Sequence, residues 1–168
     1  MNLSVWVERN ARSRRDAVAI AEGERPYATW GEFDRRMRAV AGGLHSIHGL
    51  AVGDRAALVM RNRPEYLIAQ YACWHAGLVA VPVNARLHRE EIAYILGHSG
   101  TRVVLTDPEH ADDVVPLVRD VDTLRAAVVA PGPDWAALEA ANPIPAEDRA
   151  PTDPAWLFYT SGTTGRPK

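Results

Sequence analysis

Residues 160–168 carry the side chains whose types and spacing best suit a chemical task. This stretch reads TSGTTGRPK and holds four hydroxyl-bearing residues within five positions: Thr160, Ser161, Thr163 and Thr164. Gly162 and Gly165 let the backbone turn sharply and expose its amides, and Lys168 adds a positive charge. Amides, hydroxyls and a cation that converge after a strand suit a polyphosphate.

The spacing differs from that of the Walker A loop, which is G-x-x-x-x-G-K-[ST]. Gly162 and Gly165 are too close together for that motif, and Arg166 and Pro167 separate Gly165 from Lys168. This difference counts against a phosphotransferase with a Walker-type loop. By its residue types alone, the stretch is more typical of a polar turn between two strands, so both hypotheses remain open at this point.

The full string favours the phosphate-binding hypothesis. T-S-G-T-T-G-x-P-K, preceded by the aromatic run AWLFY, resembles the phosphate-binding loop of the adenylate-forming enzymes. That superfamily contains acyl-CoA synthetases, nonribosomal-peptide adenylation domains and firefly luciferase. The resemblance covers nearly the whole chain and is weakest at residues 131–154. Seven further positions fit the family's pattern between residues 62 and 84: Asn62, Glu65, Tyr66, Ala76, Gly77, Pro82 and Asn84.

This resemblance implies a role in ATP-dependent activation of a carboxylate. Six loop residues would wrap the β- and γ-phosphates of ATP: Thr160, Ser161, Gly162, Thr163, Thr164 and Gly165. Lys168 would help to hold or release pyrophosphate, and Mg²⁺ would bridge phosphate oxygens. In the family reaction a carboxylate attacks the α-phosphorus of ATP, which gives an acyl-adenylate and pyrophosphate. A thiol, usually that of coenzyme A, then displaces AMP.

The family continues for several hundred residues past this loop. We therefore expect an N-terminal fragment that has no catalytic residue of its own and is inactive by itself. Its expected partners are a small carboxylic acid, ATP, coenzyme A and the missing C-terminal portion. Two alternatives remain: a noncatalytic interaction module, for which exposed surface favours a homodimer, and an adenylation domain that loads a carrier protein.

Apolar runs that alternate with helical segments predict the fold. Strands are expected at 55–60, 78–83, 101–106 and 126–130, with helices at 64–74, 87–96, 108–119 and 135–141. This alternation predicts a three-layer α/β fold with a mainly parallel sheet and flanking helices. Upstream, we expect a helix at 3–14, a hairpin around Gly23, and a helix that starts with a capping box at Thr29 and Glu32 and ends near Ser46.

The chain is divided here into three parts that together form one incomplete N-terminal α/β domain. Residues 1–130 are the α/β body, the Pro-rich stretch 131–154 is a linker, and residues 155–168 are a strand followed by the loop.

Composition excludes several functional classes. The net charge of −2 and the scattered basic residues do not suit a nucleic-acid-binding protein. Cys73 is the only cysteine, so no disulfide can form within the chain, and we expect a cytoplasmic protein. The most apolar stretch, residues 67–83, is too short and too interrupted for a membrane span.

The remaining reactive side chains have simpler structural explanations. His75 lies in an apolar helix and is expected to be packed there. His45 and His48 are three residues apart, but no third ligand is evident, so no metal site is predicted. Cys73 has no neighbour in sequence that lowers its pKa, so it is not predicted to be a nucleophile.

Overall fold

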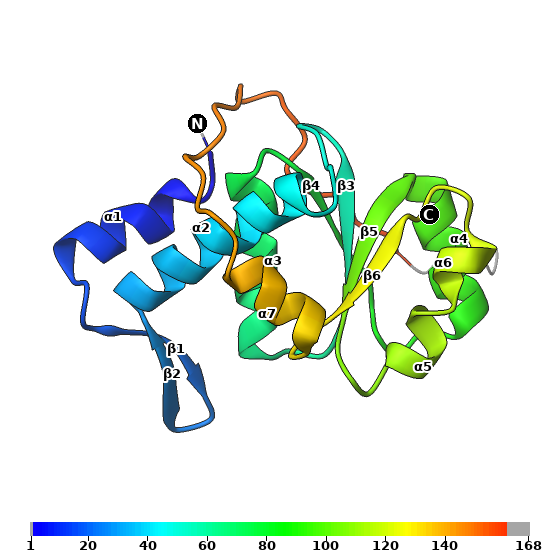
Figure 1. Cartoon of the computed structure of the whole chain (residues 1–168), viewed down its shortest axis with the longest axis horizontal. Helices are drawn as coiled ribbons and strands as arrows, with labels where there is room; N and C mark the ends of the chain where they lie inside the picture. Colours follow the sequence, from blue (N-terminus) through cyan, green and yellow to red (C-terminus); the bar gives the residue numbers. More distant parts are fainter. Residues whose placement is uncertain (1, 161–168) are drawn as a thin grey trace.

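A four-stranded parallel sheet with the strand order β4-β3-β5-β6 lies at the centre of the computed structural model, which describes residues 2–160 (Figure 1). Its strands are β3 (Arg55–Val59), β4 (Val79–Pro82), β5 (Thr101–Thr106) and β6 (Ala126–Val129). Residues in these strands are almost continuously apolar, which is typical of a parallel sheet that is buried on both faces. The four strands coincide closely with the predicted apolar runs.

Helices cover both faces of the sheet (Figure 1). Ala56 and Leu58 of β3 face a cluster that contains residues of α2 (Trp30–Ser46), α3 (Pro64–His75) and α7 (Pro133–Glu139). Ala57 and Val59 point to the opposite cluster, formed with α4 (Arg89–Ser99), α5 (Ala111–Val114) and α6 (Leu117–Asp120). The predicted three-layer α/β fold is therefore confirmed.

The N-terminal segment follows the sequence prediction closely. Helix α1 (Val5–Ser13) is followed by an antiparallel hairpin of β1 (Val18–Glu22) and β2 (Arg25–Thr29). Its turn contains Gly23, whose φ of 59° favours glycine. The Glu32 amide donates to the Thr29 hydroxyl at 3.3 Å, and the Thr29 amide donates to the Glu32 carboxylate at 2.8 Å. This reciprocal pair is the predicted capping box, and α2 begins there.

Two of the helix predictions differ most from the structure. The helix expected to end at Leu96 continues to Ser99, because the residue that adopts the left-handed terminating conformation is Gly100, with a φ of 66°. The single helix expected at 108–119 is split into α5 and α6, with Pro116 between them. Proline has no backbone N–H to donate within a helix, which explains the interruption.

The stretch 131–154 contains one short helix, α7, and then continues without regular secondary structure. It lies against the rest of the chain. The Glu147 amide donates to the His75 carbonyl at 2.9 Å, and the Ile144 carbonyl oxygen lies 2.9 Å from Nε2 of His75. These contacts fix the stretch to α3.

Among residues 2–160, no helix has the length and apolar character needed to cross a membrane.

The stretch 131–154 also approaches α2 at Gly42, and this close approach can be tested by substituting the glycine. A Cβ built on Gly42 overlaps the carbonyl oxygen of Asn142, whereas a Cβ on Gly97 of α4 meets nothing closer than 3.8 Å, at Val121. Gly42→Ala should lower the free energy of unfolding by about 1–3 kcal/mol through overpacking. Gly97→Ala should raise it by up to about 1 kcal/mol, because alanine favours the helix.

Urea unfolding of both variants checks this pair. A Gly42→Ala variant as stable as the parent chain would show that residue 142 does not pack closely against α2.

Candidate functional site

The segment that leads to the predicted phosphate-binding loop lies along the edge strand β4. Trp156 forms a parallel bridge with Ala80. The Ala80 amide donates to the Ala155 carbonyl at 3.0 Å, and the Leu157 amide donates to the Ala80 carbonyl at 2.9 Å. The strand predicted from residue 155 onward is thus reduced to a single bridge, but it pairs in the orientation of the other parallel strands.

Of the predicted loop residues, the structure describes only Thr160, which is exposed. The other six lie outside the described residues: Ser161, Gly162, Thr163, Thr164, Gly165 and Lys168. Their predicted role in binding phosphate therefore remains a prediction.

A pocket of about 830 Å³ lies where β3 and β4 end. Ligands of open parallel α/β sheets usually bind at the carboxyl ends of the strands, where the strand order reverses. Here the order reverses at β3, which lies between β4 and β5. The pocket is lined by the residues that follow these strands: Met60, Arg61, Asn62, Tyr66, Pro82, Val83, Asn84, Ala85, Arg86 and His110.

The buried carboxylate of Asp107 ties the loops after β3 and β5 together. It is 1% exposed and accepts hydrogen bonds from the Arg61 amide at 2.8 Å and from the His110 amide at 3.0 Å. Its Oδ1 also lies 2.6 Å from Nδ1 of His110. Burial alone raises the pKa of Asp107, but these hydrogen bonds outweigh burial and lower its pKa below the usual value. Asp107 is therefore charged and shapes the wall of the pocket.

The rim of this pocket is basic and polar. Arg61 pairs with Glu109 at 2.9 Å, an exposed ion pair. The Arg86 amide donates to Oδ1 of Asn84 at 3.0 Å, and within residues 2–160 the Arg86 guanidinium has no ion-pair partner. An exposed guanidinium beside side-chain amides suits an anionic group such as a phosphate or a carboxylate.

Sequence reasoning missed this pocket as a site. A signal was present, because each of β3, β4 and β5 is followed within a few residues by polar side chains, and parallel strands end at one edge. In the sequence, Asn62 and Asn84 fit the family pattern, but nothing local to either residue indicates that the two line one pocket.

The other reactive side chains make structural contacts among the described residues. His75 is fully buried, with Nδ1 at 3.0 Å from the Ser4 hydroxyl and Nε2 on the Ile144 carbonyl, and burial lowers its pKa. His45 contacts the backbone carbonyls of Leu50 and Ala76. Burial raises the pKa of Cys73 to about 12, so its thiol is unreactive.

No group of three or more His, Cys, Asp or Glu side chains in the described part of the chain could hold a metal ion.

Comparison with known proteins identifies what the chain is similar to. The family described as "AMP-binding enzyme" matches residues 7–168. A feruloyl-CoA synthase from Amycolatopsis is 38% identical over 167 residues, which cover 99% of this chain and 32% of the relative. A long-chain-fatty-acid–CoA ligase from Mycobacterium tuberculosis is 37% identical over 130 residues, which cover 71% of this chain and 24% of the relative. The chain thus spans at most about a third of the length of these relatives.

A solved structure of similar fold covers the same region. The inhibitor-bound N-terminal domain of FACL13 from Mycobacterium tuberculosis matches with a TM-score of 0.88 and 30% sequence identity. The match covers 99% of this chain and 43% of that one.

The role of Asp107 gives a prediction with a defined pH dependence. A carboxylate whose pKa is lowered by folding stabilises the protein above the unfolded pKa of about 3.9 and loses this effect as the pH falls through the folded value. Asp107→Asn should therefore lower the free energy of unfolding at pH 7 by about 1–3 kcal/mol. It should also make stability less dependent on pH below about 4.

Denaturant unfolding between pH 3 and pH 7 measures both effects. Asp113→Asn, at an exposed position of α5, serves as the control and should change stability by less than about 0.5 kcal/mol. Equal losses in the two variants would contradict the structural role of Asp107.

Proposed function

The chain belongs to the AMP-binding enzyme family, and from this premise we propose that its 168 residues act as the N-terminal part of an ATP-dependent acyl-CoA synthetase. The full-length enzyme would convert a carboxylate and ATP to an acyl-adenylate and pyrophosphate, and then form a thioester with coenzyme A. The observation that carries this proposal is the similarity, along 99% of the chain, to a CoA-thioester-forming enzyme.

Within this function, residues 160–168 bind the β- and γ-phosphates of ATP through backbone amides, hydroxyls and Lys168. Catalysis of the first step depends mainly on positioning and on stabilising charge on phosphate oxygens, which such a loop supplies. The described residues offer no carboxylate cluster that fits Mg²⁺, so we assign no step to a metal held by this part of the chain.

The pocket at the carboxyl ends of β3 and β4 is proposed to receive an anionic part of a substrate. Its rim combines the Arg86 guanidinium with Asn62 and Asn84. Hydrogen bonds between a guanidinium and a phosphate are charge-assisted and well suited to this task. ATP and coenzyme A both carry phosphate, and kinetic constants for each substrate distinguish them.

The identity of the acid is left to experiment. The two relatives described above are named for a feruloyl and for a long-chain fatty acyl substrate. An aromatic acid and a long-chain fatty acid are therefore the first two members of a test panel. Transfer to a carrier protein instead of coenzyme A is the alternative for the second step.

Acid-dependent pyrophosphate release tests the proposal. The full-length protein should release pyrophosphate from ATP with at least one acid of the panel. The 168-residue chain alone should release none, because it lacks the remainder of the site. Activity of the isolated chain would refute its assignment as an incomplete part. Inactivity of the full-length protein with every acid, including in exchange of labelled pyrophosphate into ATP, would refute the synthetase assignment.

Arg86→Ala tests the pocket. Loss of a charge-assisted contact should raise the KM for ATP or for coenzyme A by about tenfold, because such contacts contribute about 1.5–3 kcal/mol. Arg119→Ala, at an exposed position of α6, is the matched control and should leave both constants within about twofold. Unchanged constants in Arg86→Ala would remove the pocket from the proposed site.

A further inference from the structure

The segment 155–160 has few backbone contacts for a strand that must carry a binding loop. Two backbone hydrogen bonds join it to Ala80 of β4. Its outer side is exposed, with exposed fractions of 43% for Trp156 and 60% for Phe158. Backbone pairing alone therefore leaves the path of the chain toward Thr160 weakly fixed, and side-chain contacts must supply the rest.

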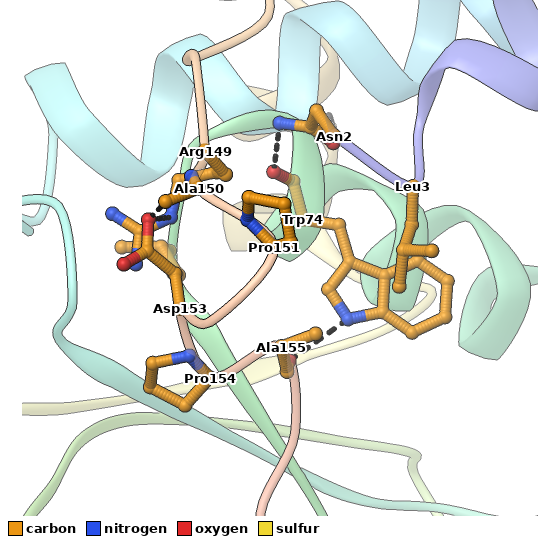
Figure 2. Close-up of a pocket in the computed structure, with 11 residues that line it drawn as sticks. Asn2, Leu3, Trp74, Arg149, Ala150, Pro151, Asp153, Pro154 and Ala155 are labelled. Carbon is orange, nitrogen blue, oxygen red and sulfur yellow. Dashed lines mark hydrogen bonds and ion pairs between the residues drawn. The ribbon is translucent and has the colours of Figure 1, made fainter.

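Trp74 of α3 holds the start of the segment from one face of the sheet. Its Nε1 donates to the Ala155 carbonyl oxygen at 2.9 Å, as the dashed line between these residues in Figure 2 shows. That oxygen also accepts from the Ala80 amide at 3.0 Å. The Trp74 ring meets the Trp156 ring edge-on, with centroids 4.8 Å apart. One indole thus contacts both residues at the start of the segment.

Trp74 is itself held firmly. It is 7% exposed, and its ring packs edge-on against Tyr71 with centroids 4.9 Å apart. Its carbonyl oxygen accepts from Nδ2 of Asn2 at 2.6 Å (Figure 2). The indole N–H is therefore a fixed donor that can set the position of Ala155.

His98 of α4 holds the far end of the segment from the opposite face. Its Nδ1 lies 2.7 Å from the Tyr159 hydroxyl. The His98 ring stacks on Tyr94 at 5.4 Å and meets the Tyr159 ring edge-on at 5.7 Å. Tyr159 also packs against the apolar cluster beneath α4. Residues 155 and 159 are thus fixed to helices on opposite faces of the sheet.

We propose that Trp74 and His98 are positioning residues, which act through Ala155 and Tyr159 to set where the phosphate-binding loop begins. This inference rests on the proposed function of residues 160–168. Contacts that fix residues 155 and 159 before a ligand arrives preorganise the entry to residues 160–168, and preorganisation increases affinity for the groups that these residues bind. Those groups are the β- and γ-phosphates, which ATP has and AMP lacks.

Binding of MgATP and of AMP to the full-length protein, measured by calorimetry, tests the anchor at Trp74. Trp74→Phe keeps an aromatic ring but removes the N–H, and should weaken MgATP binding by about threefold to tenfold, the equivalent of one hydrogen bond. AMP binding should change by less than about twofold. A purely structural role would weaken both nucleotides equally.

Trp135→Phe is the matched control. Trp135 is 2% exposed, and its Nε1 has no hydrogen-bond partner in the described part of the chain. Trp135→Phe removes an N–H that donates no hydrogen bond among the described residues. The affinities for MgATP and for AMP should therefore remain at the values of the parent protein.

Tyr159→Phe and His98→Ala test the second anchor. Each should weaken MgATP binding by about threefold to tenfold and spare AMP. The two changes remove the same contact, so their effects should not add. A variant that carries both Tyr159→Phe and His98→Ala should therefore bind MgATP with the affinity of the single variant that binds it less tightly. Tyr94→Phe keeps the ring that stacks on His98 and should leave the binding of MgATP and of AMP unchanged.

The outcomes separate the two proposals. A parent protein that binds MgATP no more tightly than AMP would refute phosphate binding by the loop, and with it this inference. A parent protein that prefers MgATP, with anchor variants that keep the same preference, would refute the positioning role alone. Equal weakening of both nucleotides would also overturn it.

Discussion

Burial of the parallel sheet on both of its faces is the constraint from which the rest of the fold follows. Ala56, Ala57, Leu58 and Val59 of β3 are each 0% exposed, so the central strand presents apolar side chains to both sides. Helices must then cover both faces, and each crossover returns the chain to the end of the sheet where every strand begins. All four strands therefore finish at the opposite end of the sheet, and the polar loops that follow them gather there.

The proposed binding regions are extensions of that sheet. The pocket with Arg86 is formed by loops that leave β3, β4 and β5, and the buried carboxylate of Asp107 joins two of them. The segment that leads to Thr160 continues the sheet beyond β4 with a parallel bridge. Two backbone hydrogen bonds hold this segment only weakly. Trp74 of α3 and His98 of α4 add the side-chain contacts that fix its position.

Local signals in the sequence were enough to predict most of the fold, because continuous apolar runs, turn glycines and the capping box at Thr29 each act within a few residues. The errors arose where a competing local effect decided the outcome. Gly100 ends α4 beyond the predicted limit at Leu96, and Pro116 interrupts the helix predicted at 108–119. The pocket could not be predicted as readily, since its residues come from three separate loops that meet only through the strand order. The predicted phosphate-binding residues from Ser161 onward lie outside the described residues, so their role rests on the motif.

The most direct test of the central claim is hydrogen–deuterium exchange of the full-length protein with and without MgATP, read at the peptide that spans residues 160–168. If this segment binds the phosphates, its amides should exchange more slowly with MgATP, and AMP should protect them much less. Protection by MgATP that is confined to other regions, with exchange at 160–168 unchanged, would contradict the assignment of this loop to ATP.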